Sequence, residues 1–544
     1  MATLRAGRAA LARGAWAQAR ASFEAALAEE ESAEALEGLS WAAWWLDDVE
    51  ACFDARERAY RGYRAAGDLR GAARMALWLS DDYSEFRRRE AVSGGWFLRA
   101  ARLLEELPPA PEHGWLAVFE AHATLAAGDP EGALGLAGRA RDLGRELGAV
   151  DVEMFAVATE GVALIAQGAI EAGMRRLDEA AAAALGGEFD DLRAAGWTCC
   201  LLIGACEGVR DFGRAAQWCA EAEAYSRRLD IRFVSGVCRA HYGAVLCWHG
   251  DWAGAERELT GALDELTEKR PAWRSVAVVR LGELRRRQGR IAEALELFGA
   301  AGRDPLARLG RAEAALDRGD AATARDDAAR LLRTAAAPMA RAGALELLVR
   351  ACVAAAEGDA GPSGGAAAAA VELRAIAEAV ATAPLRAAAS HCEGLVAAAA
   401  GDHAAARAHH EQAVEGYAGS EAPLETARAR LGLAEALAGL GRVEAARREA
   451  AAAVEALDAI GAATECGRAR AVAQRLGAAA RGELSSREVE VLRLVAEGLG
   501  DRQIAGKLTL SEHTIHRHVA NIHAKLRCSS RAAAVALAHR RGLL

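Results

Sequence analysis

The chain of 544 residues contains no apolar run of ~18 residues free of charge, the length that a membrane-spanning helix requires. It also lacks the basic-then-apolar segment of an export signal at its start. These two absences predict a protein that has no membrane contact and is located in the cytoplasm.

Cysteine pairs of the metal-binding kind are absent as well. None of the eleven cysteines forms a C-x-x-C pair or a zinc-finger spacing. Cys199, Cys200, Cys206 and Cys219 fall within helical patterns, where small buried thiols are expected. Lysine is scarce too, with 3 residues against 64 arginines, but the arginines are spread along the whole chain and mark no particular site.

Motifs of catalysis are missing or incomplete. There is no dinucleotide-binding fingerprint and no alternation of strands and helices. The segment 361–365 matches G-x-S-x-G, but it lies in a loop between helices, whereas a nucleophile elbow follows a strand. The segment 500–507 departs from a phosphate loop, and His409-His410-Glu411 lacks the second histidine of a zinc motif. We therefore expect no enzymatic activity and no cofactor.

Charge is distributed unevenly along the chain. The formal net charge is −9, yet residues 484–544 carry ten Lys/Arg and five Asp/Glu, a charge of +5, which leaves −14 for residues 1–483. A small basic segment on an acidic body is the electrostatic pattern of a localised nucleic-acid site.

The basic segment also predicts a compact helical unit. Ser485 followed by Glu488 is a capping box that starts a helix, with Val489, Leu492 and Val495/Ala496 as its buried stripe. Glu497 to Gly500 ends this helix, and we expect Asp501 to cap a second one that buries Ile504, Ala505 and Leu508. Thr509-Leu510 forms a turn, and Ser511 caps a third helix that runs to about Leu526. Two capped helices joined by a tight turn make a helix-turn-helix, whose later helix enters the major groove of DNA.

The third helix has two distinct faces. Ile515, Val519 and Ile522 are spaced by four and three residues, so they share one face and should pack inward. His516, Arg517, Ala520 and Asn521 then point outward, toward the groove.

The segment closely resembles the C-terminal DNA-binding domain of the LuxR family of bacterial transcription regulators. The matching positions keep the family's spacing over the whole unit; they are Leu484, Arg487, Glu488, Leu492, Gly498, Ile504, Ala505, Leu508, Ser511, Thr514, Ile515, His518, Asn521, Ile522, Lys525, Leu526 and Arg531. The resemblance implies a fourth helix, at about 530–541, that mediates dimerisation.

The same resemblance assigns DNA contacts. It implies base contacts at His516, Arg517 and Ala520, of which Arg517 can bind a guanine with both arms of its guanidinium. His516 and Ala520 depart from the family's usual residues, which leaves the operator sequence open. Thr514, Lys525 and Arg531 are placed for phosphates, and Asn521 is a further candidate for DNA contact. Whether His518 is a packed structural residue stays open, as does the alternative that His516 and Lys525 are simply solvated.

The first 480 residues repeat a pattern. Gly14, Trp16, Ala19, Phe23 and Ala26 recur with the same spacing, most clearly at Gly250, Trp252, Ala255, Leu259 and Ala262. Other copies begin at Gly128, Gly168, Asp211, Gly289, Gly319, Gly401 and Gly441, mostly 39 to 43 residues apart, with degenerate copies near Asp48, Gly95 and Gly358. A glycine that ends one helix and small residues on the next predict a helical hairpin, and such hairpins stack into a superhelix.

This pattern resembles the tetratricopeptide repeat, with somewhat longer helices. The predicted fold is therefore all-α: a superhelix of about twelve such units over residues 1–477, a short linker at 478–483, and a four-helix LuxR-type helix-turn-helix domain at 484–544. Trp41, Trp44, Trp45 and Trp78 either line a concave binding face or fill gaps between helices.

These observations favour a bacterial transcription regulator. Its repeats would sense a ligand or a protein partner, and its C-terminal domain would bind double-stranded promoter DNA as a homodimer and act with RNA polymerase. The alternative is a protein-interaction scaffold in which the DNA-binding domain is an accessory.

Overall fold

The computed structural model describes residues 2–229, 231–335, 338–356, 364–482, 484–540 and 543–544. Within these ranges the chain forms helices and no strand, as the sequence predicts. None of these helices is long and apolar enough to span a membrane. The segment 361–365 that matches G-x-S-x-G falls mostly outside the described ranges, and so does the degenerate copy near residue 358.

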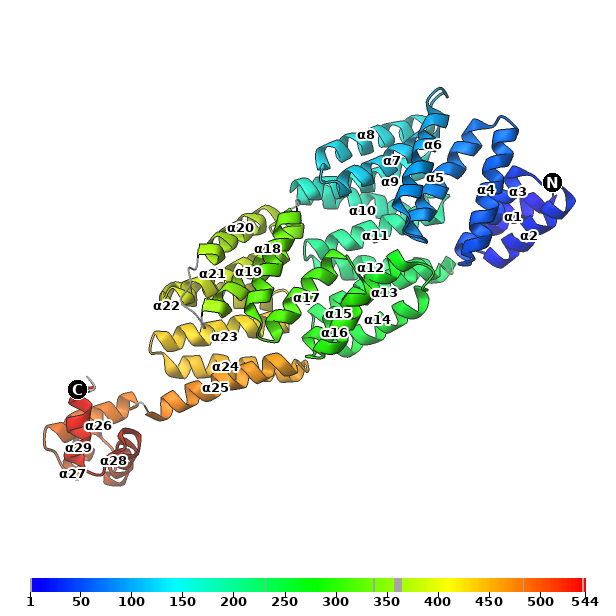
Figure 1. Ribbon diagram of the computed structural model, residues 1–544. Helices are drawn as coiled ribbons and strands as arrows, with labels where there is room; N and C mark the ends of the chain where they lie inside the picture. Colours follow the sequence, from blue (N-terminus) through cyan, green and yellow to red (C-terminus); the bar gives the residue numbers. More distant parts are fainter. Residues whose placement is uncertain (1, 230, 336–337, 357–363, 483, 541–542) are drawn as a thin grey trace.

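In the described ranges, twenty-five helices precede the C-terminal unit and pack as successive antiparallel hairpins (Figure 1). Their bounds are α1 Ala2–Ala12, α2 Trp16–Glu29, α3 Ala33–Trp45, α4 Val49–Ala65, α5 Leu69–Glu85, α6 Glu90–Leu104, α7 Pro111–Ala126, α8 Pro130–Leu147, α9 Val150–Gln167, α10 Ile170–Gly186, α11 Leu192–Gly208, α12 Phe212–Leu229, α13 Arg232–Trp248, α14 Trp252–Glu265, α15 Pro271–Arg287, α16 Ile291–Ala300, α17 Pro305–Asp317, α18 Ala321–Thr334, α19 Pro338–Ala356, α20 Gly364–Val380, α21 Ala383–Ala399, α22 His403–Ala418, α23 Pro423–Gly439, α24 Val443–Ala459 and α25 Ala463–Gly482.

The turns of the hairpins lie where the repeat pattern places them. All eight predicted turn glycines have a left-handed backbone; they are Gly14, Gly128, Gly168, Gly250, Gly289, Gly319, Gly401 and Gly441. Arg210 and Asp47 adopt the same conformation in copies without a glycine, with φ of 58° and 55°. The degenerate copy expected near Gly95 has its left-handed turn at Arg88, with φ of 48°, between α5 and α6; Gly95 itself lies inside α6.

An aromatic ring between two glycines locks neighbouring hairpins together. The ring of Phe23 on α2 presses against Gly7 and Gly38, where an added Cβ would lie 2.7 and 2.3 Å from it. Phe298 lies in the same way between two other glycines, Gly282 and Gly310. Since real Cβ contacts are never this short, the missing side chains are what let the helices approach.

The tryptophans of the first repeats belong to the interior. Trp44 and Trp78 are buried, and Trp41 and Trp45 are half-buried. The guanidinium of Arg193, itself buried, lies 4.7 Å from the ring centre of Trp41 and 3.8 Å from that of Trp78. This placement favours the gap-filling alternative over a binding face.

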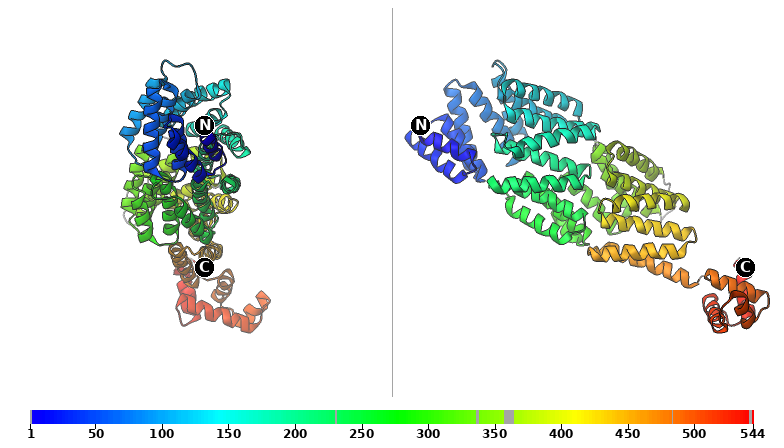
Figure 2. Two further views of the ribbon diagram at one scale, coloured as in Figure 1. Left: turned by 90° about the vertical axis from the view of Figure 1, so that its right-hand side faces the viewer. Right: turned by 180° about the vertical axis from the view of Figure 1, so that it is seen from behind.

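Contacts between hairpins that are far apart in the sequence hold the elongated superhelix together (Figure 2). The buried Arg270, just before α15, donates to Asp47, to Glu85 and to the carbonyl of Trp44, at 2.5, 2.5 and 2.6 Å. Further along, the indole N–H of Trp248 donates to the carbonyl of Ser420 at 3.0 Å. These contacts bring segments more than 170 residues apart in sequence side by side.

The last superhelical helix leads to the C-terminal unit, which lies at the far end of the elongated molecule from the N-terminus (Figure 1). Helix α25 runs to Gly482, so residues 478–482 of the predicted linker are helical. The C-terminal unit consists of α26 Ser486–Ala496, α27 Asp501–Leu508, α28 Glu512–Leu526 and α29 Arg531–Arg540. The fourth helix thus lies where the family resemblance places it.

Candidate nucleic-acid interface

Helix α26 begins at the predicted capping box. Ser485 Oγ accepts a hydrogen bond from the backbone N–H of Glu488 at 3.2 Å, and Glu488 Oε2 accepts one from the N–H of Ser485 at 2.7 Å. Its predicted buried stripe is partly wrong: Leu492 is buried, but Val491 is the second fully buried residue and Ala496 is exposed. The helix packs against both α28 and α29, and this wider contact shifts the buried face.

The second helix begins one residue earlier than expected. Asp501 is the first residue of α27 and not its cap; Gly500 holds the cap position, where its N–H donates to Gln503 Oε1 at 2.9 Å. The Asp501 carboxylate instead forms an ion pair with Arg531 of α29 and lies 3.7 Å from His516 Nδ1. The capping prediction is therefore wrong, because a partner distant in sequence holds this carboxylate.

The turn between α27 and α28 is tight. Thr509 ends α27 in a left-handed conformation with φ of 55°. Ser511 then caps α28 as predicted, since its Oγ accepts from the N–H of Thr514 at 3.1 Å. The two helices and this turn form the predicted helix-turn-helix.

The two faces of α28 separate as the spacing predicts. Ile515, Val519 and Ile522 are buried in the core of the unit. On the opposite side, the predicted reading residues are all exposed; they are His516, Arg517, Ala520 and Asn521. Among the residues that the structure describes, Arg517 makes no hydrogen bond or ion pair, so its guanidinium is available to a ligand.

The predicted phosphate contacts have partners inside the unit. Lys525 Nζ donates to the buried Glu488 Oε2 at 2.7 Å, and Arg531 pairs with Asp501. Thr514 is half-buried, with its Oγ1 2.7 Å from Ser511 Oγ. Burial raises the pKa of Glu488, but the hydrogen bonds from Lys525 and the Ser485 N–H outweigh this and lower it overall. Phosphate contact at these three residues stays a prediction.

Other basic residues that the sequence argument passed over are also exposed. Arg502 on α27 and Arg527, which ends α28, form no ion pair with any described residue. In the sequence, only their position within the helix-turn-helix marks them as candidates for DNA contact. His518 is half-buried, which leaves its role open.

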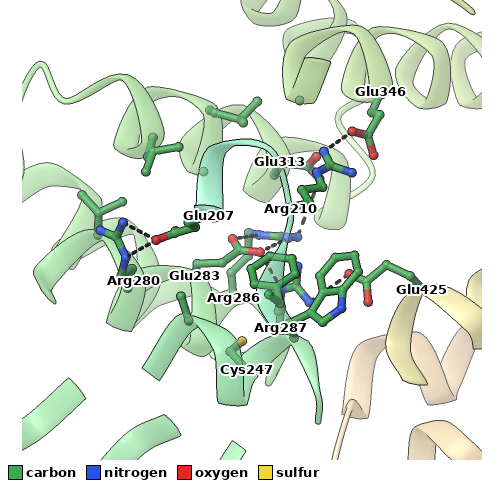
Figure 3. A pocket seen from close by; sticks show the side chains of 18 of the residues that line it. Glu207, Arg210, Cys247, Arg280, Glu283, Arg286, Arg287, Glu313, Glu346 and Glu425 are labelled. Carbon is green, nitrogen blue, oxygen red and sulfur yellow. Dashed lines mark hydrogen bonds and ion pairs between the residues drawn. The ribbon is translucent and has the colours of Figure 1, made fainter. Parts of the chain in front are cut away.

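A second feature is a cavity of about 290 Å³ in the lumen of the superhelix (Figure 3). Its walls come from helices between α11 and α23, so it lies between hairpins that are far apart in sequence. Six arginines and five glutamates line it together with aromatic and aliphatic side chains. Nothing in the sequence signals this cavity, because its walls meet only when the hairpins stack.

The fold and this geometry define the class of the protein. It is a superhelix of tetratricopeptide-like helical hairpins that carries a helix-turn-helix DNA-binding domain at its C-terminal end. Residues 482–538 match the family described as bacterial regulatory proteins, luxR family.

Curated relatives share this domain. The nitrate/nitrite response regulator protein NarP of Escherichia coli is 44% identical over 54 residues, which are 10% of this chain and 25% of NarP. A homologous regulator of Haemophilus influenzae is 46% identical over 54 residues, 10% of this chain and 26% of that protein. A putative HTH-type transcriptional regulator of Mycobacterium tuberculosis is 43% identical over 61 residues, 11% of this chain and 7% of that protein. The chain therefore spans at most about a quarter of these relatives.

Solved structures similar to the superhelix are helical-repeat proteins. A thermophilic TPR protein of Thermus thermophilus has 24% identity and a TM-score of 0.29 over 36% of this chain and 98% of its own. The Cut9–Hcn1 hetero-tetramer of APC/C has 13% identity and a TM-score of 0.45 over 83% of this chain and 86% of its own. The hairpin packing described above carries the assignment of the fold.

Proposed function

We propose that the chain is a bacterial transcription regulator that binds double-stranded promoter DNA through its C-terminal domain. The observation that carries this proposal is the exposed face of α28, with Arg517 unengaged at its centre, on a unit that matches the luxR family. Helix α28 lies in the major groove, where Arg517 binds a guanine and His516, Ala520 and Asn521 contact neighbouring positions.

The proposed complex is a homodimer on DNA. Helix α29 leaves the small side chains of Ala532, Ala533 and Ala536 exposed, and a second copy can pack on them. Two domains related by two-fold symmetry then read two half-sites. RNA polymerase is the proposed partner in transcription, and the cytoplasm is the proposed location.

The repeats are proposed to sense a ligand or a protein partner. The lumen cavity supports a ligand, because concave sites with a few convergent polar groups are the usual small-molecule sites of proteins. We further propose that the chain acts without a catalytic step. Among the described residues, no group of three or more His, Cys, Asp or Glu side chains is arranged to hold a metal ion.

An electrophoretic shift assay with fragments from upstream of the chain's own gene tests the proposal. We expect binding that weakens as salt rises, since phosphate contacts release counterions, and that is weaker at the specific site in the Arg517→Ala variant. Absence of salt-sensitive binding to every fragment, with the variant behaving like the parent, would rule the proposal out.

The second candidate is a protein-interaction scaffold with an accessory DNA-binding domain. The superhelix of α1–α25 favours it, since this domain is by far the larger part of the chain. Truncation after Gly482, where α25 ends, separates the two candidates. Loss of promoter-dependent transcription supports the regulator, whereas an unchanged transcript profile with intact partner binding supports the scaffold.

A further inference from the structure

The charges that line the lumen cavity are arranged as ion pairs between helices. Arg280 of α15 donates to Glu207 of α11 at 2.5 Å, and Arg350 of α19 donates to both oxygens of Glu313 of α17, at 2.9 and 2.8 Å. Figure 3 shows the Glu207 pair on one side of the cavity and Glu313 on another. The lining is therefore close to charge balance, and it presents both signs to an occupant.

Neighbouring arginines keep the carboxyls of two lining glutamates, Glu207 and Glu313, ionised at neutral pH. Burial raises the pKa of Glu207, but Arg280 and His241 overcome this and lower it to about 2. The same competition, with Arg350 as the main opposing charge, lowers the pKa of Glu313. An occupant with a positive group thus meets full negative charges.

Several polar atoms of the lining can form further hydrogen bonds. The Nη1 atom of Arg350 makes both bonds to Glu313, so its Nε and Nη2 have no partner among the described residues. Arg428 uses Nε and Nη2 for Glu465 and leaves Nη1 without one. His391 Nδ1 and Glu425 Oε2 are buried and likewise lack a hydrogen bond within the described part of the chain.

These unpartnered atoms include both positively charged donors and a negatively charged acceptor. The donors of Arg350 and Arg428 lie near His391, whose pKa is lowered by burial and by the charges of these two arginines. The free acceptor on Glu425 belongs to a carboxylate held 2.9 Å from Arg287. His391 Nδ1 and Glu425 Oε2 are buried without a partner among the described residues, which is unfavourable, so a ligand that forms hydrogen bonds with them is favoured.

The remaining wall is apolar. Phe212 and Trp248 stack with ring centres 4.6 Å apart, and Tyr417 lies 6.3 Å from Trp248. Leu306 and Leu309 of α17 also face the cavity. A volume of 290 Å³ lies at the lower end of small-molecule pockets, which range over about 300–1,000 Å³. The space suits a small molecule and is too small for a folded partner or a long peptide.

We propose that this cavity binds a small zwitterion of the amino-acid or dipeptide class. Its carboxylate binds the free donors of Arg350 and Arg428, its ammonium binds Glu425 or Glu207, and its apolar side chain lies against Trp248. A simple anion or cation fits less well, because an anion would leave Glu425 Oε2 without a partner and a cation would leave the donors of Arg350 and Arg428 without one. This inference rests on the proposed sensing role of the repeats and names the ligand class of that role.

The test uses the full-length protein and a panel of the twenty free amino acids and of dipeptides with an apolar residue. Thermal-shift measurements followed by calorimetric titration find the tightest binder. That compound is then compared with its C-terminal amide and its N-acetyl derivative. We expect each derivative to bind at least tenfold more weakly, because each loses one charge-assisted contact.

Paired variants test the location. Ala244 of α13 lines the cavity, so Ala244→Phe should fill it and abolish binding. Ala253→Phe on the exposed surface of α14 is the matched control and should bind like the parent. Arg350→Lys keeps the ion pair with Glu313 but removes the second nitrogen of the guanidinium that is proposed to bind the carboxylate. It should therefore weaken binding of the free amino acid more than that of its amide.

Three results would overturn the inference: no panel member binds at millimolar concentration, the N-acetyl derivative binds as well as the parent compound, or the Ala244→Phe variant keeps full affinity. Promoter binding by the ligand-free protein is measured separately. A protein that binds DNA but no zwitterion loses this inference alone, and one that binds a zwitterion but no promoter DNA loses the proposed function alone.

Discussion

Arg517 is the residue at which DNA recognition can be tested most directly. Its side chain is exposed beside His516 on α28, and no described residue competes for its guanidinium. Replacement by alanine should lower the affinity for the specific site by about 1–3 kcal/mol, the usual value of a forked contact to guanine. Binding to unrelated DNA should change much less, because a phosphate contact is not lost.

Competition shift assays with specific and random duplexes measure this difference. Arg325→Ala is the control, since Arg325 is an exposed arginine on α18, far from the DNA-binding unit. Equal losses on both duplexes would mean that Arg517 contacts phosphate and does not read a base.

His410 offers a prediction about stability. It is fully buried between Gly394 and Gly432, in the position that Phe23 and Phe298 occupy in other hairpins. Neither ring nitrogen has a partner among the described residues, and burial lowers its pKa to about 4. The unfolded chain, with a pKa of about 6.5, therefore takes up a proton between pH 6.5 and 4 that the folded chain does not.

Stability should consequently fall as the pH drops through this window. His410→Phe removes the unsatisfied nitrogens and the proton uptake, so it should raise stability by about 1–3 kcal/mol at pH 8 and by more at pH 5. Thermal unfolding at both pH values measures this. His409→Phe on the same helix, beside Glu393, is the control and should not stabilise the protein. A gain that is no larger at pH 5 than at pH 8 would contradict the argument.

At the scale of elements, Arg270 connects the first hairpins to α15. Its side chain is buried and bound to Asp47 and Glu85. Arg270→Met leaves these two carboxylates without their partner, which should cost about 3–5 kcal/mol. Thermal unfolding of this variant is compared with that of Arg325→Ala, which removes an exposed ion pair. A loss no larger than that of the control would mean that the contact between these hairpins does not depend on Arg270.

The elements were predictable from sequence to the extent that local signals define them. Ser485 and Ser511 cap the helices that they were expected to cap, and the repeat glycines lie at the turns. Asp501 was misread because its carboxylate binds Arg531, thirty residues away, and no local pattern carries that information.

The lumen cavity was not predictable for the same reason. Its ion pairs join helices that meet only through the superhelix; Glu207 and Arg280 are 73 residues apart in sequence. The spacing of Arg and Glu along the repeats looks like an ordinary solvated helix surface. Only the curvature of the stacked hairpins, set by close approaches such as that of Phe23 to Gly38, turns these residues toward one another.

At the scale of the whole molecule, the contrast of charge between the two parts should shape DNA binding. Residues 484–544 carry +5 and residues 1–483 carry −14, so the superhelix repels the DNA that the C-terminal unit attracts. The isolated fragment 482–544 should therefore bind non-specific DNA more tightly than the full chain at low salt. Because exposed charges are screened beyond about 10 Å at 0.1 M salt, the difference should shrink as salt rises.

Fluorescence anisotropy with a random duplex, titrated at several salt concentrations, measures both affinities. A fragment in which Arg517 is replaced by alanine is the control, and it should bind the random duplex almost as tightly as the parent fragment, because Arg517 is expected to read a base. If the full chain and the fragment have the same affinity at low salt, the acidic superhelix lies too far from the DNA to act on it. If instead the full chain binds more tightly at every salt concentration, dimerisation through the superhelix outweighs the repulsion and the electrostatic argument fails.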